Sequence, residues 1–381
     1  MLSSQRPLFD IPDDICYFNC GYMSPLLKSV AKAGVEGVMK KASPWTLTPT
    51  DFFTESNAAR NLFAQLINAK ATDIAIIPSA SYGISVAAKN LKIEVDQHIL
   101  VLNDQFPSNI YSWQELCKET GAHIKTIAQP LDHDWTSAVL GAITPNTAIA
   151  ALPNCLWTDG GLLDLEKIGE KLRSVGAKLV LDVTQSLGAM PLDIQKVQPD
   201  FLIAASYKWL LGPYSVGFLY AAPHQQNGLP IEHNWLNRKG SEDFSKLVDY
   251  QDDFQQGAVR FDMGQRANFA LMPMAVEALR QILEWGVADI YETLTHRTSE
   301  IAEYGAKLGL TSVPLEYRAG HFLGLEFKGG VPETLLKQLA TENIFVSARG
   351  NSLRVTPHLY NTDYDADRLL NALKKNLGKI S

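Results

Sequence analysis

The chain of 381 residues has a formal net charge of −7, with 46% hydrophobic and 20% charged residues, which is the composition of an ordinary globular protein. The negative charge and the lack of any dense Lys/Arg run argue against nucleic acid as a partner, because phosphate backbones would be repelled. No apolar stretch is long enough to cross a bilayer, and the first residues lack the basic and apolar regions of a signal peptide.

The four cysteines, at positions 16, 20, 117 and 155, form no paired clusters. Scattered thiols are typical of a reducing compartment and indicate neither a disulfide framework nor a zinc site. We therefore expect a cytoplasmic protein with no metal site and no membrane partner.

Short apolar runs typical of β-strands recur in the first two thirds of the chain, at 74–77, 99–102, 123–127, 148–152, 178–182, 201–205 and 216–220. Helical patterns lie between several of them, for example at 109–121 and at 165–176, where a glycine ends the pattern. Strands that are apolar throughout and alternate with helices predict a mostly parallel sheet covered on both faces. We therefore expect an α/β fold with one large domain built on a seven-stranded sheet.

The pattern predicts three parts of the chain: an N-terminal segment (1–45), a large ligand-binding domain (46–265) and a small α+β C-terminal domain (266–381). The N-terminal segment holds one helix and no sheet of its own, and we expect it to pack on the small domain. The small domain begins with long helical stretches, and its remaining elements are predicted as strands at 321–327, 344–350 and 352–357 and a closing helix at 363–378.

Polar side chains follow several of the predicted strands, at the carboxyl ends where open α/β sheets bind ligands. Ser81 lies in a turn that opens a helix, whose free N–H groups suit a phosphate, although a plain N-cap is the simpler interpretation of this turn alone. Asp182 and Lys208 follow two other strands, and Phe106 and Asn154 follow two more. Each has an ordinary structural explanation, but together they match the needs of one ligand.

Pyridoxal phosphate requires a lysine that forms an imine, a carboxylate that keeps the ring nitrogen protonated, a ring to stack on and donors for its phosphate. Burial of the lysine favours the neutral amine that forms the imine. The sequence therefore predicts a pyridoxal-phosphate site formed by the ends of neighbouring strands.

The ordered motifs resemble those of the class-V aminotransferase family, which are fold-type-I pyridoxal-phosphate enzymes related to cysteine desulfurases, kynureninases and isopenicillin-N-epimerase-like proteins. The resemblance covers nearly the whole chain, through YFNCGYMSP, SASYGIS, FPSNIYSW, LDVTQSLGAMPLD, SYKWLLGP, RFDMG and SLRVTPHLYNT. It implies a fold-type-I transferase that acts on an amino acid.

The resemblance also implies which residues hold the cofactor. Lys208 corresponds to the Schiff-base lysine, Asp182 to the partner of the ring nitrogen, and Phe106 to the residue that stacks on the ring. The remaining implied contacts go to the phosphate, from Ala80 (through its N–H), Ser81 and Tyr207, and to the phenolic oxygen, from Gln185 and Asn154.

Further roles concern the substrate and a second subunit. In relatives the residue after the RFDMG motif reaches the phosphate held by the other subunit; here it is Gln265, where desulfurases have threonine. Arg354 falls where relatives bind the substrate α-carboxylate, a task that suits the guanidinium fork. Arg349 either contacts the substrate or pairs within the protein, and Trp157 either closes over the substrate or packs in the core.

One departure bears on the reaction. Desulfurases carry a nucleophilic cysteine shortly before the carboxylate-binding arginine, whereas here no cysteine follows Cys155, so the sequence predicts that the protein is not a cysteine desulfurase. We expect an aminotransferase that works as a homodimer with its site at the interface. The alternatives are an epimerase, a racemase or a kynureninase-like lyase, and beyond these a non-catalytic binding protein on the same scaffold.

Overall fold

A computed structural model of the chain describes residues 1–377. Its larger sheet has seven strands in the order β2-β8-β7-β6-β5-β3-β4. The strands are β2 (Ile74–Ile77), β3 (His98–Leu102), β4 (His123–Ile127), β5 (Thr147–Pro153), β6 (Lys178–Asp182), β7 (Phe201–Ala205) and β8 (Gly217–Ala221). Neighbours from β4 to β7 run parallel, and β8 is antiparallel to both β7 and β2. The predicted seven-stranded, mostly parallel sheet is therefore confirmed.

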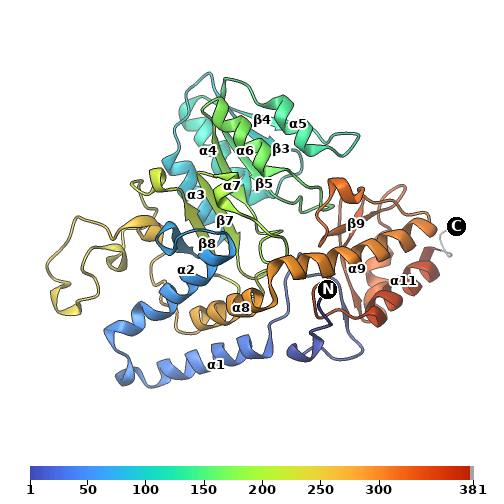
Figure 1. Cartoon of the computed structure of the whole chain (residues 1–381), viewed down its shortest axis with the longest axis horizontal. Helices are drawn as coiled ribbons and strands as arrows, with labels where there is room; N and C mark the ends of the chain where they lie inside the picture. Colours follow the sequence, from blue (N-terminus) through green and yellow to red (C-terminus); the bar gives the residue numbers. More distant parts are fainter. Residues whose placement is uncertain (378–381) are drawn as a thin grey trace.

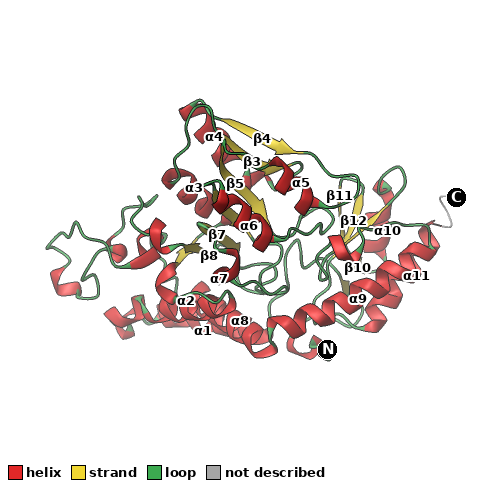
Figure 2. Ribbon diagram, turned by 45° about the horizontal axis from the view of Figure 1, so that its top comes forward, coloured by secondary structure: helices red, strands yellow, loops and turns green. Residues whose placement is uncertain are grey.

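Helices cover both faces of this sheet, as its continuous apolar strands require (Figures 1 and 2). The side chains of β2 alternate between the two faces of the sheet. Ile74 and Ile76 belong to an apolar cluster on one face, and Ala75 and Ile77 belong to a cluster on the other. Helices α3 (Ala80–Asn90) and α4 (Tyr111–Thr120) supply side chains to the second cluster. Among the helices that supply the first cluster are α2 (Thr54–Leu66), α5 (Trp135–Ala142), α6 (Leu165–Ser174) and α7 (Ile194–Val197).

Two consecutive helices, α8 (Leu271–Trp285) and α9 (Val287–Lys307), lead from the large sheet to the C-terminal part, as Figure 1 shows in orange. That part contains an antiparallel sheet in the order β11-β12-β9, packed against its own apolar cluster. Its elements are β9 (Leu323–Glu326), α10 (Glu333–Thr341), β10 (Ile344–Phe345), β11 (Ser347–Arg349), β12 (Ser352–Val355) and α11 (Asp363–Leu377). The last residue of the predicted closing helix, at position 378, lies outside the described residues.

The N-terminal residues contact both parts of the chain. Strand β1 (Cys16–Tyr17) pairs in parallel with β10, so these residues do contribute a short strand, which the sequence did not predict. Helix α1 (Lys28–Ala42) packs along α8, and a Cβ at Gly37 would overlap the carbonyl oxygen of Phe269, which lies just before α8. The division of the chain at positions 45 and 265 stays a prediction.

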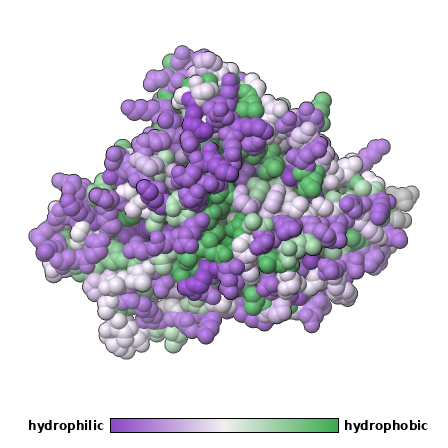
Figure 3. All heavy atoms as spheres, viewed as in Figure 1, coloured by the Kyte–Doolittle hydropathy of each residue, from purple (hydrophilic) through white to green (hydrophobic). Residues whose placement is uncertain are grey.

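Hydrophilic residues cover most of the face seen in Figure 3, and hydrophobic residues gather near its centre. Within residues 1–377, none of the helices combines the length and apolar character needed to span a bilayer. The same part of the chain holds no cluster of three or more His, Cys, Asp or Glu side chains suited to a metal ion.

Candidate active site

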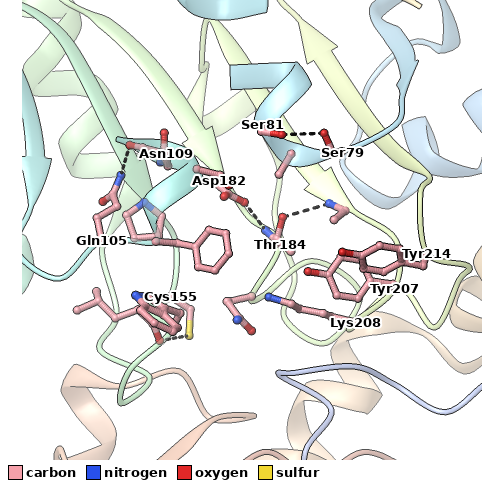
Figure 4. Close-up of a pocket in the computed structure, with 18 of the residues that line it drawn as sticks. Ser79, Ser81, Gln105, Asn109, Cys155, Asp182, Thr184, Tyr207, Lys208 and Tyr214 are labelled. Atoms are coloured by element: carbon pink, nitrogen blue, oxygen red, sulfur yellow. Dashed lines mark hydrogen bonds between the residues drawn. The ribbon is translucent and has the colours of Figure 1, made fainter. Parts of the chain in front are cut away.

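A cavity of about 300 Å³ lies at the carboxyl ends of the parallel strands, where the sequence predicted a ligand (Figure 4). Its walls come from the turns that follow β2, β3, β5, β6 and β7 and from the residues that precede β8. Seven of the predicted site residues line it together: Ala80, Ser81, Phe106, Asp182, Gln185, Tyr207 and Lys208.

Lys208 follows β7 in a tight turn that is fixed by hydrogen bonds. The Ser206 hydroxyl donates to the carbonyl oxygen of Pro213 at 2.6 Å, and the Gly212 N–H donates to the carbonyl oxygen of Ser206 at 2.9 Å. The turn leaves the lysine side chain only 6% exposed, with its nitrogen directed into the cavity (Figure 4). The nitrogen lies 5.5 Å from the centroids of both the Phe106 and the Tyr207 rings.

The electrostatic surroundings of Lys208 favour the neutral amine. Burial lowers its pKa from 10.5 to about 8; the Asp182 carboxylate opposes this shift, and the guanidinium groups of Arg354 and Arg349 add to it. No carboxylate among residues 1–377 lies within 4 Å of the amine. A neutral amine is the nucleophile that attacks an aldehyde, so Lys208 is suited to that reaction near neutral pH.

A pH profile of aldehyde attachment tests this assignment. As pH rises, the neutral fraction of Lys208 increases through its pKa, so the rate constant for attachment of pyridoxal phosphate to the apoprotein should rise. We expect it to rise around pH 8 and to level off above pH 9, as followed by absorbance in stopped-flow mixing. A rate that still climbs tenfold per pH unit between 9 and 10 would mean that the amine has an ordinary lysine pKa.

Asp182 ends β6 and lies at the base of the cavity. Its Oδ1 accepts a hydrogen bond from the Thr184 N–H at 3.0 Å, and the Thr184 hydroxyl accepts from the N–H of Ala205 at 3.1 Å. These bonds fasten the turn after β6 to the end of β7 and hold the carboxylate in place. Its other oxygen accepts no hydrogen bond from residues 1–377 and can take one from a protonated ring nitrogen.

The first turn of α3 is suited to binding an anion. Ser79 caps this helix by accepting from the Tyr82 N–H at 3.2 Å, and its hydroxyl lies 2.8 Å from that of Ser81. The N–H groups of Ala80 and Ser81 have no intrahelical partner at this position, and they lie at the positive end of the helix dipole. The Tyr207 and Tyr214 rings, 4.7 Å apart, are drawn side by side at the cavity wall in Figure 4.

Gln185 is held in one orientation by its neighbours. Its Oε1 accepts from the indole N–H of Trp209 at 3.2 Å, and its Nε2 donates to the carbonyl oxygen of Gly21 at 3.1 Å. Beneath it, His321 Nε2 lies 2.7 Å from the carbonyl oxygen of Gln185, and burial lowers the pKa of this histidine to about 4. The amide therefore keeps one N–H for a ligand oxygen in the cavity.

Four predicted residues do not line the cavity: Asn154, Gln265, Arg349 and Arg354. Asn154 is buried between two cavity residues, and Gln265 is exposed in a left-handed conformation (φ 57°) beside a different surface hollow near α1. Both arginines lie on the small sheet against Trp157, which does line the cavity. The roles of all the predicted site residues stay predictions.

Sequence reasoning missed several residues that line the cavity, among them Gln105, Cys155, Thr184, Tyr214 and Ser215. Thr184 and Gln105 are next to predicted residues in the strand-end turns, so extending the search along each turn would have found them. Tyr214 and Ser215 precede β8, and no pattern signals that an antiparallel strand begins at this edge of the cavity.

These residues fit pyridoxal phosphate. The cavity presents an amine whose pKa is lowered by burial, a carboxylate with a free oxygen, unpaired N–H groups at a helix N-terminus and the ring of Phe106, which is 36% exposed. Lys208, Asp182, the start of α3 and Phe106 would hold the aldehyde, ring nitrogen, phosphate and ring face respectively.

The family Aminotransferase class-V matches residues 48–364. YcbU, an uncharacterised aminotransferase of Bacillus subtilis (strain 168), is 27% identical over 334 residues, which cover 86% of this chain and 84% of that protein. A kynureninase of Bacillus cereus is 24% identical over 371 residues, which cover 92% and 83% of the two chains.

The apo structure of a cysteine desulfurase from Thermococcus onnurineus NA1 superimposes with a TM-score of 0.86 at 19% identity, over 100% of this chain and 99% of that chain. At this identity the similarity shows the fold alone, and it confirms the predicted fold-type-I architecture. The same similarity does not support the prediction that excluded a cysteine desulfurase. The chain therefore belongs to the class-V aminotransferase family, as its motifs predicted, and is a pyridoxal-phosphate-dependent enzyme.

Proposed function

We propose that the protein is an aminotransferase that transfers the amino group of an amino acid through pyridoxal phosphate. The observation that carries the proposal is that Lys208 lines the cavity while Arg354 is present as a second, buried cation. The Arg354 guanidinium has no carboxylate partner within 4 Å among residues 1–377. A cation held without a counter-ion near a reactive amine is suited to an amino acid, which brings its own carboxylate.

Asp182, Lys208 and Gln185 in the cavity are each proposed to have a separate role in this reaction. Bound pyridoxal phosphate supplies an electron sink for the bonds at the substrate Cα. The Asp182 carboxylate would keep a proton on the ring nitrogen, and Lys208 Nζ would take the proton from Cα and deliver it to the other carbon bonded to the amino nitrogen. The Gln185 N–H would donate to the phenolic oxygen, and the hydrogen bond from Trp209 orients the amide for this contact.

Arg354 is proposed to bind the substrate α-carboxylate. Its Nε and Nη2 donate to the Ser347 hydroxyl at 3.0 and 2.7 Å, and its Nη1 donates to the carbonyl oxygen of Trp157 at 2.9 Å. All of these acceptors are neutral, so the positive charge stays uncompensated, and burial lowers the pKa of Arg354 to about 10. A carboxylate that reached the free N–H bonds would relieve this cost.

The state of the thiols argues for amino transfer over sulfur transfer. Of the four cysteines, Cys155 lines the cavity, but it is 1% exposed, and burial raises the pKa of its thiol well above the ordinary value. A protonated thiol is a poor nucleophile, and sulfur transfer to a protein cysteine requires a thiolate. Epimerisation, racemisation and lyase chemistry begin with the same proton loss and are the alternative outcomes.

A homodimer in the cytoplasm is part of the proposal. Helix α1 and the turn after it expose Val35, Val38, Met39 and Trp45, with 58–81% of each residue exposed, and an apolar surface of this kind suits burial against a second copy. Gln265 is exposed near α1, where it can reach toward the phosphate of a neighbouring subunit.

Visible absorption of the holoprotein during addition of single amino acids tests the proposed function. We expect a band from bound pyridoxal phosphate that at least one amino acid converts to the pyridoxamine form, and a 2-oxo acid should then restore the original band. Conversion without an oxo-acid requirement, with epimer or cleavage products, would replace the aminotransferase by one of the alternatives. Persulfide release from cysteine would identify a desulfurase.

A further inference from the structure

The register of the β11–β12 hairpin places two arginines on one face of the small sheet. Ser347 pairs with Arg354, and Arg349 pairs with Ser352, so these four side chains share a face because paired residues and alternate residues point the same way. The pair between them, Ala348 and Leu353, points to the opposite face, where Leu353 is fully buried in the apolar cluster of the small domain. Both guanidinium groups therefore face away from that core.

Both guanidinium groups lie against Trp157, which forms part of the cavity wall. Their Cζ atoms are 5.5 Å (Arg349) and 5.9 Å (Arg354) from the centroid of the indole ring. Trp157 lines the cavity, donates from Nε1 to the carbonyl oxygen of Asp104 at 2.6 Å, and packs edge-on against Phe106 at 5.5 Å. The two cations therefore flank the side of the cavity that faces the small domain.

Neither cation is neutralised by the described part of the chain. No Asp or Glu oxygen of residues 1–377 lies within 4 Å of either guanidinium, and Arg349 donates only to the backbone carbonyl oxygen of Ala348. Asp159, two residues from the indole, accepts instead from the N–H of Gly161. The two arginines also repel each other, since Arg349 contributes after burial to the lowered pKa of Arg354.

We propose that the substrate is a dicarboxylic amino acid, with its α-carboxylate on Arg354 and its side-chain carboxylate on Arg349. This inference rests on the proposed function and names its substrate class. A neutral amino acid would compensate one of the two positive charges, whereas an aspartate- or glutamate-like substrate compensates both. Arg349 is the specificity-determining residue, because it lies at the hairpin tip and is the less buried of the two.

Matched ligands separate the two charges in an experiment on the holoprotein. Succinate and butyrate have the same number of carbons but carry two carboxylates and one, and isothermal titration gives their dissociation constants. We expect the wild type to bind succinate about 10- to 100-fold more tightly than butyrate, the range for a hydrogen-bonded charge pair. Arg349→Gln should reduce this ratio to within about threefold, and turnover of glutamate should fall relative to turnover of glutamine.

Arg280→Gln is the matched control, because this arginine lies on the exposed side of α8 and pairs with Glu277. It should keep the wild-type ratio. Equal binding of the two acids by the wild type, or an unchanged ratio in Arg349→Gln, overturns the inference. A protein that converts neutral amino acids without preference also overturns it, although the proposed aminotransferase would stand. If no amino acid changes the cofactor spectrum, the proposed function fails and this inference fails with it.

Discussion

Lys208→Ala is expected to lower the rate of amino-group transfer by about 10³-fold or more, because one side chain both anchors the cofactor and carries the proton at Cα. The variant should also lose covalent retention of pyridoxal phosphate. Borohydride reduction followed by mass spectrometry measures this directly: the wild type should gain the mass of the cofactor on the peptide that contains Lys208, and the variant should not.

The fold should survive this change. Alanine removes an amine that is 6% exposed and has no carboxylate partner within residues 1–377, so the thermal midpoint of the apoprotein should stay at or above that of the wild-type apoprotein. Lys125→Ala is a suitable control, because this half-buried lysine of β4 donates to the carbonyl oxygen of Ala142 outside the cavity. Turnover by Lys208→Ala within tenfold of the Lys125→Ala rate would remove Lys208 from its proposed role.

The large sheet was predictable because its strands are fully buried. Runs such as 74–77 and 201–205 are apolar on both faces, and the observed strands β2 and β7 begin and end at the predicted residues. The strand order was not predictable, since pairing between β2 and β8 joins residues that are far apart in the sequence. The predicted strand at 344–350 is two strands, because β10 pairs with β1 and β11 pairs with β12.

The candidate site was predictable where adjacent parallel strands end together. β6 and β7 are neighbours in the sheet, so the rule that ligands bind at strand ends brought Asp182 and Lys208 to one cavity. Arg349 and Arg354 required a different kind of information, the register of a hairpin in the other domain and its contact with Trp157. Sequence spacing does not contain that contact, because docking of the two sheets depends on side-chain packing.

Beside the site, the RFDMG motif has a structural function that the resemblance did not reveal. Asp262 is fully buried and forms ion pairs with Arg60 and Arg266, which are 3% and 1% exposed. Its Oδ1 also accepts from the N–H of Ile76 in β2 at 2.8 Å, and the Met263 N–H donates to the carbonyl oxygen of Ile76 at 2.9 Å. The motif therefore holds β2 in place, and β2 leads directly into the predicted anion-binding turn at Ser79–Ser81.

Asp262→Ala is accordingly expected to lower the free energy of unfolding by about 3–5 kcal/mol, because it leaves two buried guanidinium groups without their carboxylate. Denaturant titration of the apoprotein measures this, with Asp363→Ala as control. Asp363 is an exposed partner of Arg297, and losing this surface pair should cost less than about 1 kcal/mol. Similar losses in the two variants would contradict the assignment of Asp262 as the buried anchor. Because Asp262 holds β2, its loss should also weaken binding of pyridoxal phosphate, although the carboxylate itself lies outside the cavity.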